Sequence, residues 1–312
     1  MKPLPVWAWW DDSPRPAIIE RTLASWTHTG GLTAANGFEL RLLGPETLQD
    51  WLPEEERDHI CLSRDFVDVS PALRSDFLRL ALLARYGGMW LDVSVLVTEP
   101  LQHWIQSALA QGTQFIAMRN RDNEGPSCPG ELPFIESSML IAAAPGLPII
   151  EAWRKVFWTL PQQGLDAASA RAWTRSLALP RDVHVHIDLD YHVVYWAWLK
   201  ALVKAPRGLD SFPGVWLRDG TAEHYMPCPL DTNFRWCRGD LRSASWPGPF
   251  MKLASETRSS LRDREHEVPL LRKSVLYGQS KAKGASISGC LLIPLILLVV
   301  CVWFWHALRP SL

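Results

Sequence analysis

The stretch SDFLRLALLARYGGMWLDVSVLVTEPL, residues 75–101, is the most informative segment of this 312-residue chain. Its first half ends a predicted helix over 71–86, which has Ser70 as capping residue, proline at its first position and glycine just past its end. The β-branched run that follows, over 89–97, predicts a strand. The stretch therefore predicts a helix, a glycine corner and a strand in immediate succession.

The helix and the corner carry the first group of candidate residues. Asp76 and Arg79 are three positions apart, so they share one face of the helix. Taken alone, such a pair is more often a surface ion pair. Gly87 and Gly88 form a tight corner without side chains, where backbone can approach a ligand closely. The order and spacing of these residues together favour a ligand site.

The predicted strand carries the second group. Side chains alternate along a strand, so one face presents polar atoms from Trp90, Asp92 and Ser94, and the other face is apolar. The helix, the corner and this strand face can thus present an acid–base pair, open backbone, a carboxylate and a hydroxyl to one place.

This combination suits a nucleotide-diphosphate sugar, whose leaving group gains charge as the glycosidic bond breaks. A divalent cation neutralises that charge and takes oxygen ligands from protein carboxylate and diphosphate. Asp92 can supply the carboxylate, and Ser94, about 6.6 Å further along a strand, can reach the cation's water shell or the ribose. Arg79 can pair with phosphate, and Asp76 can accept hydrogen bonds from sugar hydroxyls. We expect Asp92 as the catalytic residue, and Asp92 and Ser94 at a Mn²⁺ or Mg²⁺ ion.

The stretch resembles the sugar-binding region of DXD-containing glycosyltransferases, specifically the capsular polysaccharide synthesis group close to glycosyltransferase family thirty-two. That group's pattern is S-D-x-x-R-x-x-x-L-x-x-Y-G-G-x-W-x-D-[ASV]-[TS]-V, and the chain matches it at Ser75, Asp76, Arg79, Leu83, Tyr86, Gly87, Gly88, Trp90, Asp92, Ser94 and Val95. Weaker similarity covers roughly residues 3–255, in PLPVWAWWDDSPRP (3–16), MLIAAAPGLPIIEAW (139–153), IDLDYHVVYW (187–196) and PFMKLAS (249–255). Ser94 replaces the second Asp of a strict D-x-D motif, and a hydroxyl is a poorer metal ligand than a carboxylate.

The resemblance implies an α/β fold of the GT-A type, with a Rossmann-like sheet whose Asp92 strand ends at the donor. It implies that Asp92 and the third motif position handle ribose, diphosphate and metal. The other implied donor-binding residues are Asp76, Arg79, Tyr86, Gly87, Gly88, Trp90 and Ser94, with one of Trp9 and Trp10 near the nucleotide base. The implied reaction is a hexosyltransferase-like transfer from a nucleotide sugar to a glycan or lipid-linked acceptor, with retention of anomeric configuration.

The resemblance implies that residues 1–255 form one glycosyltransferase domain. Strand, helix, strand at the start suggests an α/β fold. We expect further strands at 6–10, 38–43, 115–118 and 138–143, and helices at 17–28, 51–59, 151–158, 167–176 and 193–203. Residues 205–250 are rich in Pro, Gly and Trp and predict loops, which with residues 119–136 are expected to select sugar and acceptor.

A membrane anchor is expected after this domain. Residues 284–308 contain no Lys, Arg, Asp or Glu and are long enough to span a bilayer. A charged linker over 256–283 precedes them. Its last four basic residues face only Arg309 beyond the helix, so the positive-inside tendency places the domain in the cytosol, as does the lack of an N-terminal signal peptide. A Golgi or ER lumenal domain is the alternative, since eukaryotic relatives are commonly lumenal.

Charge and motif content disfavour some other classes of function. The net charge is −1 at pH 7, which disfavours nucleic-acid binding. Pairing of Cys228 with Cys237 stays open. A nucleotidyltransferase would usually need a Gly-rich phosphate loop with Lys near the N-terminus, and the only Lys in residues 1–150 is Lys2. A catalytically silent, membrane-bound accessory protein that binds nucleotide sugar or glycan remains the alternative.

Overall fold

A computed structural model describes residues 2–11, 13–59, 69–121, 124, 132–180, 189–219 and 250–253. The strands are β1 (Leu4–Trp9), β2 (Phe38–Leu43), β3 (Gly88–Leu91), β4 (Val95–Val97), β5 (Phe115–Arg119), β6 (Ile135–Ala142), β7 (Val215–Asp219) and β8 (Phe250–Lys252). The α-helices are α1 (Ala17–His28), α2 (Glu54–His59), α3 (Pro71–Tyr86), α4 (Gln102–Ala110), α5 (Pro148–Phe157), α6 (Ala167–Ser176) and α7 (Val193–Lys204). Short 3₁₀ helices lie at Ala34–Asn36, Pro45–Asp50, Pro161–Gln163 and Gly208–Ser211.

Several predictions fall outside the described residues. These are the linker 256–283, the membrane helix 284–308 and the pair Cys228 and Cys237. Within the described part of the chain, no helix is both long and apolar enough to cross a bilayer.

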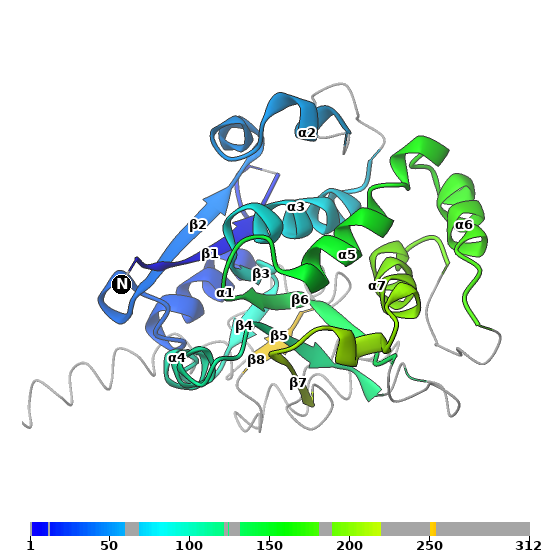
Figure 1. The fold of residues 1–312 in the computed structure, drawn as a ribbon. Coiled ribbons are helices and arrows are strands. Elements are labelled where there is room, and N and C mark those ends of the chain that lie inside the picture. The colour runs from blue at the N-terminus through cyan, green and yellow to red at the C-terminus, as the bar shows by residue number, and fades with distance from the viewer. Residues whose placement is uncertain are drawn as a thin grey trace, which may run out of the picture.

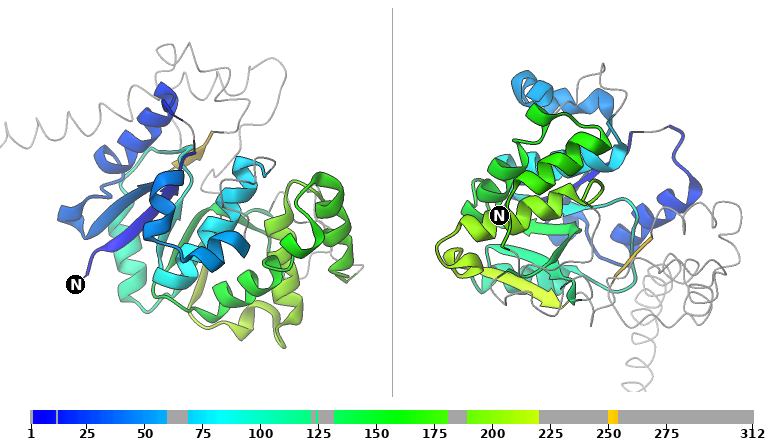
Figure 2. Two further views of the ribbon diagram at one scale, coloured as in Figure 1. Left: turned by 90° about the horizontal axis from the view of Figure 1, so that it is seen from above. Right: turned by 90° about the vertical axis from the view of Figure 1, so that its right-hand side faces the viewer.

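The centre of the molecule is a six-stranded mixed sheet in the order β2-β1-β3-β6-β5-β7. Strand β1 pairs in parallel with both β2 and β3, whereas β6 runs antiparallel to β3 and β5. Strands β4 and β8 form a separate antiparallel pair. The chain is thus an α/β protein, and Figure 2 shows in its left view that α6 and α7 gather at the end away from β2.

Two hydrophobic cores cover the two faces of the sheet. Alternate residues of β1 and β3 point to opposite faces, so Trp7 and Trp90 enter the core with α3, α5 and α7. Val6 and Met89 enter the core with α1 and α4. Figure 1 shows α3 and α5 on one side of the sheet and α1 and α4 on the other.

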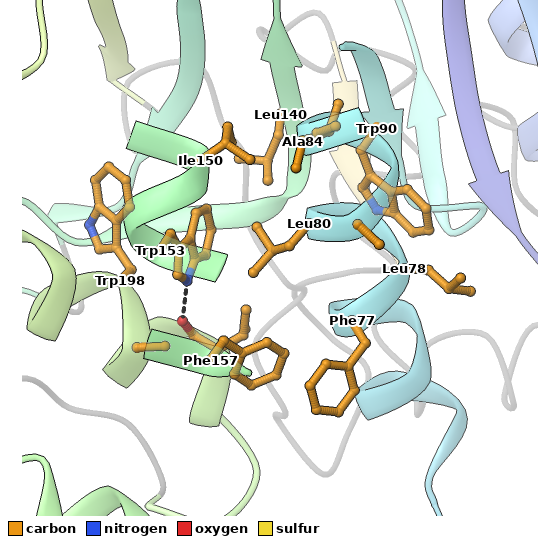
Figure 3. Packing of buried hydrophobic residues seen from close by; sticks show 14 of the residues in the cluster. Phe77, Leu78, Leu80, Ala84, Trp90, Leu140, Ile150, Trp153, Phe157 and Trp198 are labelled. Carbon is orange, nitrogen blue, oxygen red and sulfur yellow. Dashed lines mark hydrogen bonds between the residues drawn. The ribbon is translucent and has the colours of Figure 1, made fainter. Parts of the chain in front are cut away.

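Helix α3 is fixed in rotation by aromatic packing on α5. The Phe77 ring stacks on the Phe157 ring with centroids 4.4 Å apart, and both side chains are fully buried (Figure 3). Trp153 of α5 donates from Nε1 to the Val194 carbonyl at 2.7 Å, which ties α5 to α7 in turn. Because Phe77 is anchored on α5, its neighbours Asp76 and Arg79 are held toward the sheet.

Most predicted elements are confirmed, including α1, α3, α6 and β2 with the predicted bounds. The prediction of a single strand over 89–97 is wrong. Strand β3 ends at Leu91, the chain turns with Val95 N–H donating to the Asp92 carbonyl at 2.9 Å, and β4 then pairs with β8. Tertiary contacts therefore override the β propensity of this run, since the Val93 carbonyl in the turn accepts a hydrogen bond from the Thr22 hydroxyl of α1.

The segment 205–250 was expected to be loops, and β7 corrects this in part. Strand β7 pairs in parallel with β5 along its whole length, from Phe115↔Val215 to Arg119↔Asp219. Its Val-Trp-Leu sequence suits a strand, but Pro and Gly before it obscure the pattern.

Candidate functional site

Helix α3 and strand β3 lie side by side and run in opposite directions. Their charged residues therefore lie at the same height along the two elements. The helix rises about 10 Å from Tyr86 back to Arg79. The strand advances about 13 Å from Gly88 forward to Asp92. The two rises nearly match, so the side chains of Arg79 and Asp92 meet at the carboxyl end of β3.

The guanidinium of Arg79 is the centre of the site. Its Nη1 lies 2.9 Å from Asp76 Oδ1, and its Nη2 lies 3.1 Å from Asp92 Oδ1. The same group donates to the hydroxyls of Ser75, at 3.0 Å, and Ser137. Arg79 is only 4% exposed. The fork that was expected to hold diphosphate therefore holds two aspartates, and Arg79 positions them.

The carboxylate of Asp92 is held on both oxygens. Oδ1 accepts from the Trp90 indole at 2.7 Å as well as from Arg79, which confirms that Trp90 and Asp92 share a face. Oδ2 accepts from the ammonium of Lys252. Burying charges is costly unless they are paired, and each charge here has a partner. The Asp92 side chain nevertheless stays 15% exposed, so it faces solvent more than Arg79 does.

Lys252 lies in β8 and contacts Asp92, although the two residues are 160 positions apart in sequence. Strand β8 pairs with β4 so that Lys252 is opposite Val95. The Leu253 N–H donates to the Ser94 carbonyl at 2.9 Å, next to the turn that carries Asp92. The second small sheet thus serves to hold Lys252 over the end of β3.

A second hydrogen-bonded chain extends the site along β6. The Ser137 hydroxyl donates to the Tyr195 hydroxyl at 3.1 Å, which donates to Glu136 Oε2 at 3.3 Å. Asn120 Nδ2 donates to Glu136 Oε1 at 2.5 Å. Burial raises the pKa of Glu136, and the Asn120 hydrogen bond offsets this only in part. Burial and the nearby Glu136 charge also raise the pKa of Tyr195 well above its usual value.

The two aspartates titrate differently because their partners differ. Burial raises the pKa of Asp76 to about 7, against the opposing charge of Arg79. Burial acts the same way on Asp92, but the charges of Lys252 and Arg79 more than offset it and lower its pKa to about 2. Asp92 is therefore an anion at neutral pH, whereas Asp76 is near its midpoint.

The glycine corner lies at the opposite end of β3 and is filled by protein. A Cβ on Gly87 would lie 2.8 Å from the Ala144 carbonyl carbon, and one on Gly88 would lie 2.5 Å from the Pro5 carbonyl oxygen. Both residues have positive φ, +66° and +98°. The expectation that this corner leaves open backbone for a ligand is wrong, because strand β1 and the chain after β6 occupy the space.

Tyr86 also lies at this packed end. Its hydroxyl donates to the Trp51 carbonyl at 2.7 Å, and its ring packs against Trp7 and Trp51. The structure therefore brings Asp76, Arg79, Trp90 and Asp92 together, and it keeps Tyr86, Gly87 and Gly88 apart from them.

Trp9 and Trp10 lie beside the charged end. The parallel register pairs Trp7 with Trp90, so two residues further on Trp9 is level with Asp92. Trp9 is 6% exposed and belongs to the core on the Trp90 side, whereas Trp10 packs toward the other core. Among the described residues, neither indole nitrogen has a hydrogen-bond partner.

The expected metal ligands, Asp92 and Ser94, do not fit a divalent cation as they stand. Both Asp92 oxygens already accept from cationic groups. Ser94 is 5% exposed and lies in the turn rather than on a continuous strand face. Within the described ranges, no three His, Cys, Asp or Glu side chains are grouped to hold a metal ion.

Several site residues were missed from the sequence. Lys252 and Tyr195 lie in segments that were recognised only as weakly similar to the family, PFMKLAS and IDLDYHVVYW. Glu136, Ser137 and Ser138 are consecutive polar residues inside a fully buried strand. That polar run is a signal that the sequence does carry.

Three solved glycosyltransferase structures show overall similarity at low identity. PaToxG glycosyltransferase is 11% identical with a TM-score of 0.38, over 88% of this chain and 84% of that one. A glycosyltransferase involved in glycosylating the major capsid of PBCV-1 is 12% identical with a TM-score of 0.37, over 85% and 100%. Mouse xyloside xylosyltransferase 1 is 11% identical with a TM-score of 0.40, over 81% and 98%. These scores are too low to assign a function.

Sequence comparison is more informative. Glycosyltransferase afumC of Aspergillus fumigatus is 30% identical over 164 residues, which is 50% of this chain and 40% of that protein. The family described as capsular polysaccharide synthesis protein matches residues 1–163, just over half of the 312 residues. That range contains Asp76, Arg79 and Asp92. The chain therefore belongs to the capsular polysaccharide synthesis protein family.

Proposed function

We propose that this chain is a glycosyltransferase that uses a nucleotide-sugar donor bound at the Asp92 end of β3. The observation that carries the proposal is the convergence of Asp76, Arg79 and Asp92 in one hydrogen-bonded group. This group lies where parallel strands β1 and β3 end, which is where α/β sheets bind ligands. Family membership supports the same activity, as does the name of the relative that matches half of the chain.

The residues of the site have separate roles in this proposal. Asp92 faces the donor, because it is the more exposed of the two aspartates bound by Arg79. Arg79 holds Asp92 and Asp76 in place and supplies positive charge beneath the diphosphate. Asp76 accepts hydrogen bonds from sugar hydroxyls, and Trp9, level with Asp92, lies nearest to the base.

The reaction breaks the bond between the anomeric carbon and a diphosphate oxygen. The nucleoside diphosphate leaves with the electron pair, and the acceptor hydroxyl oxygen forms the new bond. In a retaining transfer the acceptor approaches from the leaving-group side, so its proton passes to the departing phosphate oxygen. Fixed charges that stabilise the departing oxygen are the main contribution expected of the protein. The acceptor class proposed is a glycan or a lipid-linked acceptor.

The experiment is a screen of nucleotide sugars with the purified full chain, measuring release of nucleoside diphosphate and free sugar. Each donor is assayed with Mn²⁺, with Mg²⁺ and with EDTA. Release that depends on Asp92, but not on the exposed Asp50 in a matched Asp50→Asn control, supports the proposal. Binding of nucleotide without release of sugar would instead identify a catalytically silent accessory protein.

Membrane attachment belongs to the same proposal. The apolar run 284–308 and the basic residues before it support a single-pass anchor with the domain in the cytosol. Protease treatment of sealed membranes tests the orientation. Digestion of the domain without detergent supports the cytosolic side, and protection until detergent is added supports the lumenal side.

A further inference from the structure

We infer that the ammonium group of Lys252, rather than a divalent cation, neutralises the donor's diphosphate, an inference that rests on the proposed glycosyltransferase function. Lys252 would lie between Asp92 and the diphosphate and donate hydrogen bonds to both. The transfer would then proceed without an added metal ion.

Both carboxylate oxygens of Asp92 already accept hydrogen bonds. A metal ion at this carboxylate needs a free oxygen lone pair in the direction of the diphosphate. Oδ1 already accepts from Trp90 and Arg79, and Oδ2 accepts from Lys252. Oδ1 thus uses both of its lone pairs, and the one left on Oδ2 lies beside the Lys252 ammonium, whose positive charge opposes the binding of a dication there. The lysine itself already supplies a positive charge at this carboxylate.

Few other side chains near Asp92 could act as ligands of a divalent cation. A strict D-x-D motif supplies a second carboxylate two residues after the first, and here that residue is Ser94. Its neutral hydroxyl adds no negative charge to attract a dication. The other acidic side chains of the described cluster already have partners. Asp76 pairs with Arg79, and Glu136 accepts hydrogen bonds from Asn120 and Tyr195.

The two cations that contact Asp92 differ in their exposure to solvent. Arg79 has 5% of its side chain exposed, and its guanidinium is bonded to two aspartates and two serines. The Lys252 side chain is 20% exposed. Lys252 is therefore the cation of this cluster that a diphosphate entering from solvent can reach, and its flexible stem allows it to turn while Asp92 keeps Arg79 and Trp90.

The chemistry balances without a further reactant. The electron pair of the breaking bond goes to the diphosphate oxygen, where Lys252 N–H groups stabilise the charge as hydrogen-bond donors. The ammonium stays protonated throughout, and the acceptor proton goes to the phosphate oxygen. A preorganised charge of this kind requires no reorganisation at the moment of reaction.

The test measures binding of UDP, GDP, ADP, CDP and TDP to the full chain by calorimetry, in EDTA and then in Mn²⁺. The inference predicts that the preferred nucleotide binds in EDTA within about threefold of its affinity in Mn²⁺. The Lys252→Met variant, which keeps the length of the stem, should bind about 10- to 100-fold more weakly in EDTA, as expected for losing a charged hydrogen bond. The exposed Lys204→Met variant is the matched control.

Three results would overturn the inference. Binding in Mn²⁺ but not in EDTA shows that a metal ion is needed, and it leaves the proposed function intact. Unchanged binding by folded Lys252→Met shows that the lysine is not a diphosphate ligand. No binding of any nucleotide in either condition removes both the inference and the proposed function. If Lys252→Met does not fold, the wild-type measurement in EDTA still decides whether a metal ion is needed. Lys252→Arg then replaces Lys252→Met as the test of the side chain.

Discussion

The two ends of strand β3 carry the same family pattern but differ in what surrounds them. At its start, Gly87 and Gly88 are enclosed by backbone, and Tyr86 packs between Trp7 and Trp51. At its end, Asp92 lies in a group of charged and hydroxyl side chains that is partly open to solvent. We call these the packed end and the charged end.

One sequence motif therefore serves two purposes in this fold. The packed end sets the angle at which α3 returns as β3, because positive φ at both glycines allows a corner that other residues rarely adopt. The charged end is a consequence of that angle, since it brings Asp76 and Arg79 level with Asp92. Mutations at the packed end should therefore change stability, and those at the charged end should change turnover.

Loss of the Asp92 charge at the charged end should reduce activity strongly. Asp92→Asn keeps the shape of the side chain but removes the charge that holds Lys252 and Arg79. We expect kcat to fall about 100- to 1,000-fold, the range for losing one preorganised electrostatic contact, while circular dichroism shows a folded protein. Sugar transfer at the wild-type rate by folded Asp92→Asn would remove the charged end as the catalytic site, and Asp50→Asn controls for loss of an exposed carboxylate.

At the packed end, Gly88→Ala should change the stability of the protein and not its kcat. The added Cβ meets the Pro5 carbonyl oxygen at 2.5 Å, and φ is +98°. Strain and overpacking together should lower the free energy of unfolding by roughly 2–4 kcal/mol. Urea denaturation measures this, and Gly112→Ala is the control, since φ is +88° there and nothing lies within 4 Å. Equal losses in the two variants would mean that backbone strain alone, not close packing, explains Gly88.

A pH measurement separates the two aspartates of the charged end. The folded chain holds a proton on Asp76 up to about pH 7, whereas an unfolded chain releases it near the ordinary pKa of 3.8. Asp76 therefore favours the folded state most below that ordinary pKa, and this contribution is lost as pH rises toward 7. Asp92, with its pKa of about 2, stays ionised over the same range.

The free energy of unfolding of wild type minus that of Asp76→Asn should therefore decrease from about pH 5 to about pH 7.5. The subtraction removes the contribution of Glu136 and other groups that titrate in both proteins. A difference that stays constant over this range would mean that Asp76 is ionised throughout.

Loss of the Tyr86 hydroxyl at the packed end should have only a small effect on stability. Tyr86→Phe keeps the ring between Trp7 and Trp51 and removes the hydrogen bond to the Trp51 carbonyl. We expect about 1 kcal/mol of lost stability and an unchanged kcat and KM for the donor. A raised KM for the donor with unchanged stability would return Tyr86 to the donor site.

Local patterns in the sequence predicted the helices and strands well, because their signals are local. Helix α3 has its capping Ser70, whose hydroxyl accepts from the Leu73 N–H at 3.2 Å, and its terminal glycine. The meeting of Asp76, Arg79 and Asp92 was also predictable, since one helix and one strand joined by a short corner must return alongside each other. The family pattern supplied the same three residues.

The rest of the site depends on contacts between distant segments. Nothing near Lys252 in the sequence indicates that β8 pairs with β4, so its ion pair with Asp92 could not be derived from local spacing. The break at Asp92–Ser94 follows from the same pairing, which the β-branched run concealed. The closed glycine corner depends on how β1 and the chain after β6 pack, and a glycine in sequence cannot distinguish open space from tight packing.

A crystal structure of the full chain with its preferred nucleoside diphosphate would show directly where the donor binds. We expect the diphosphate at the charged end, within hydrogen-bond distance of the Lys252 ammonium and beside Asp92, with the base near Trp9. We also expect the glycine corner to be unchanged from the unliganded form. A diphosphate bound against Gly87 and Gly88, or at a place that none of Asp76, Asp92 and Lys252 reaches, would contradict these expectations.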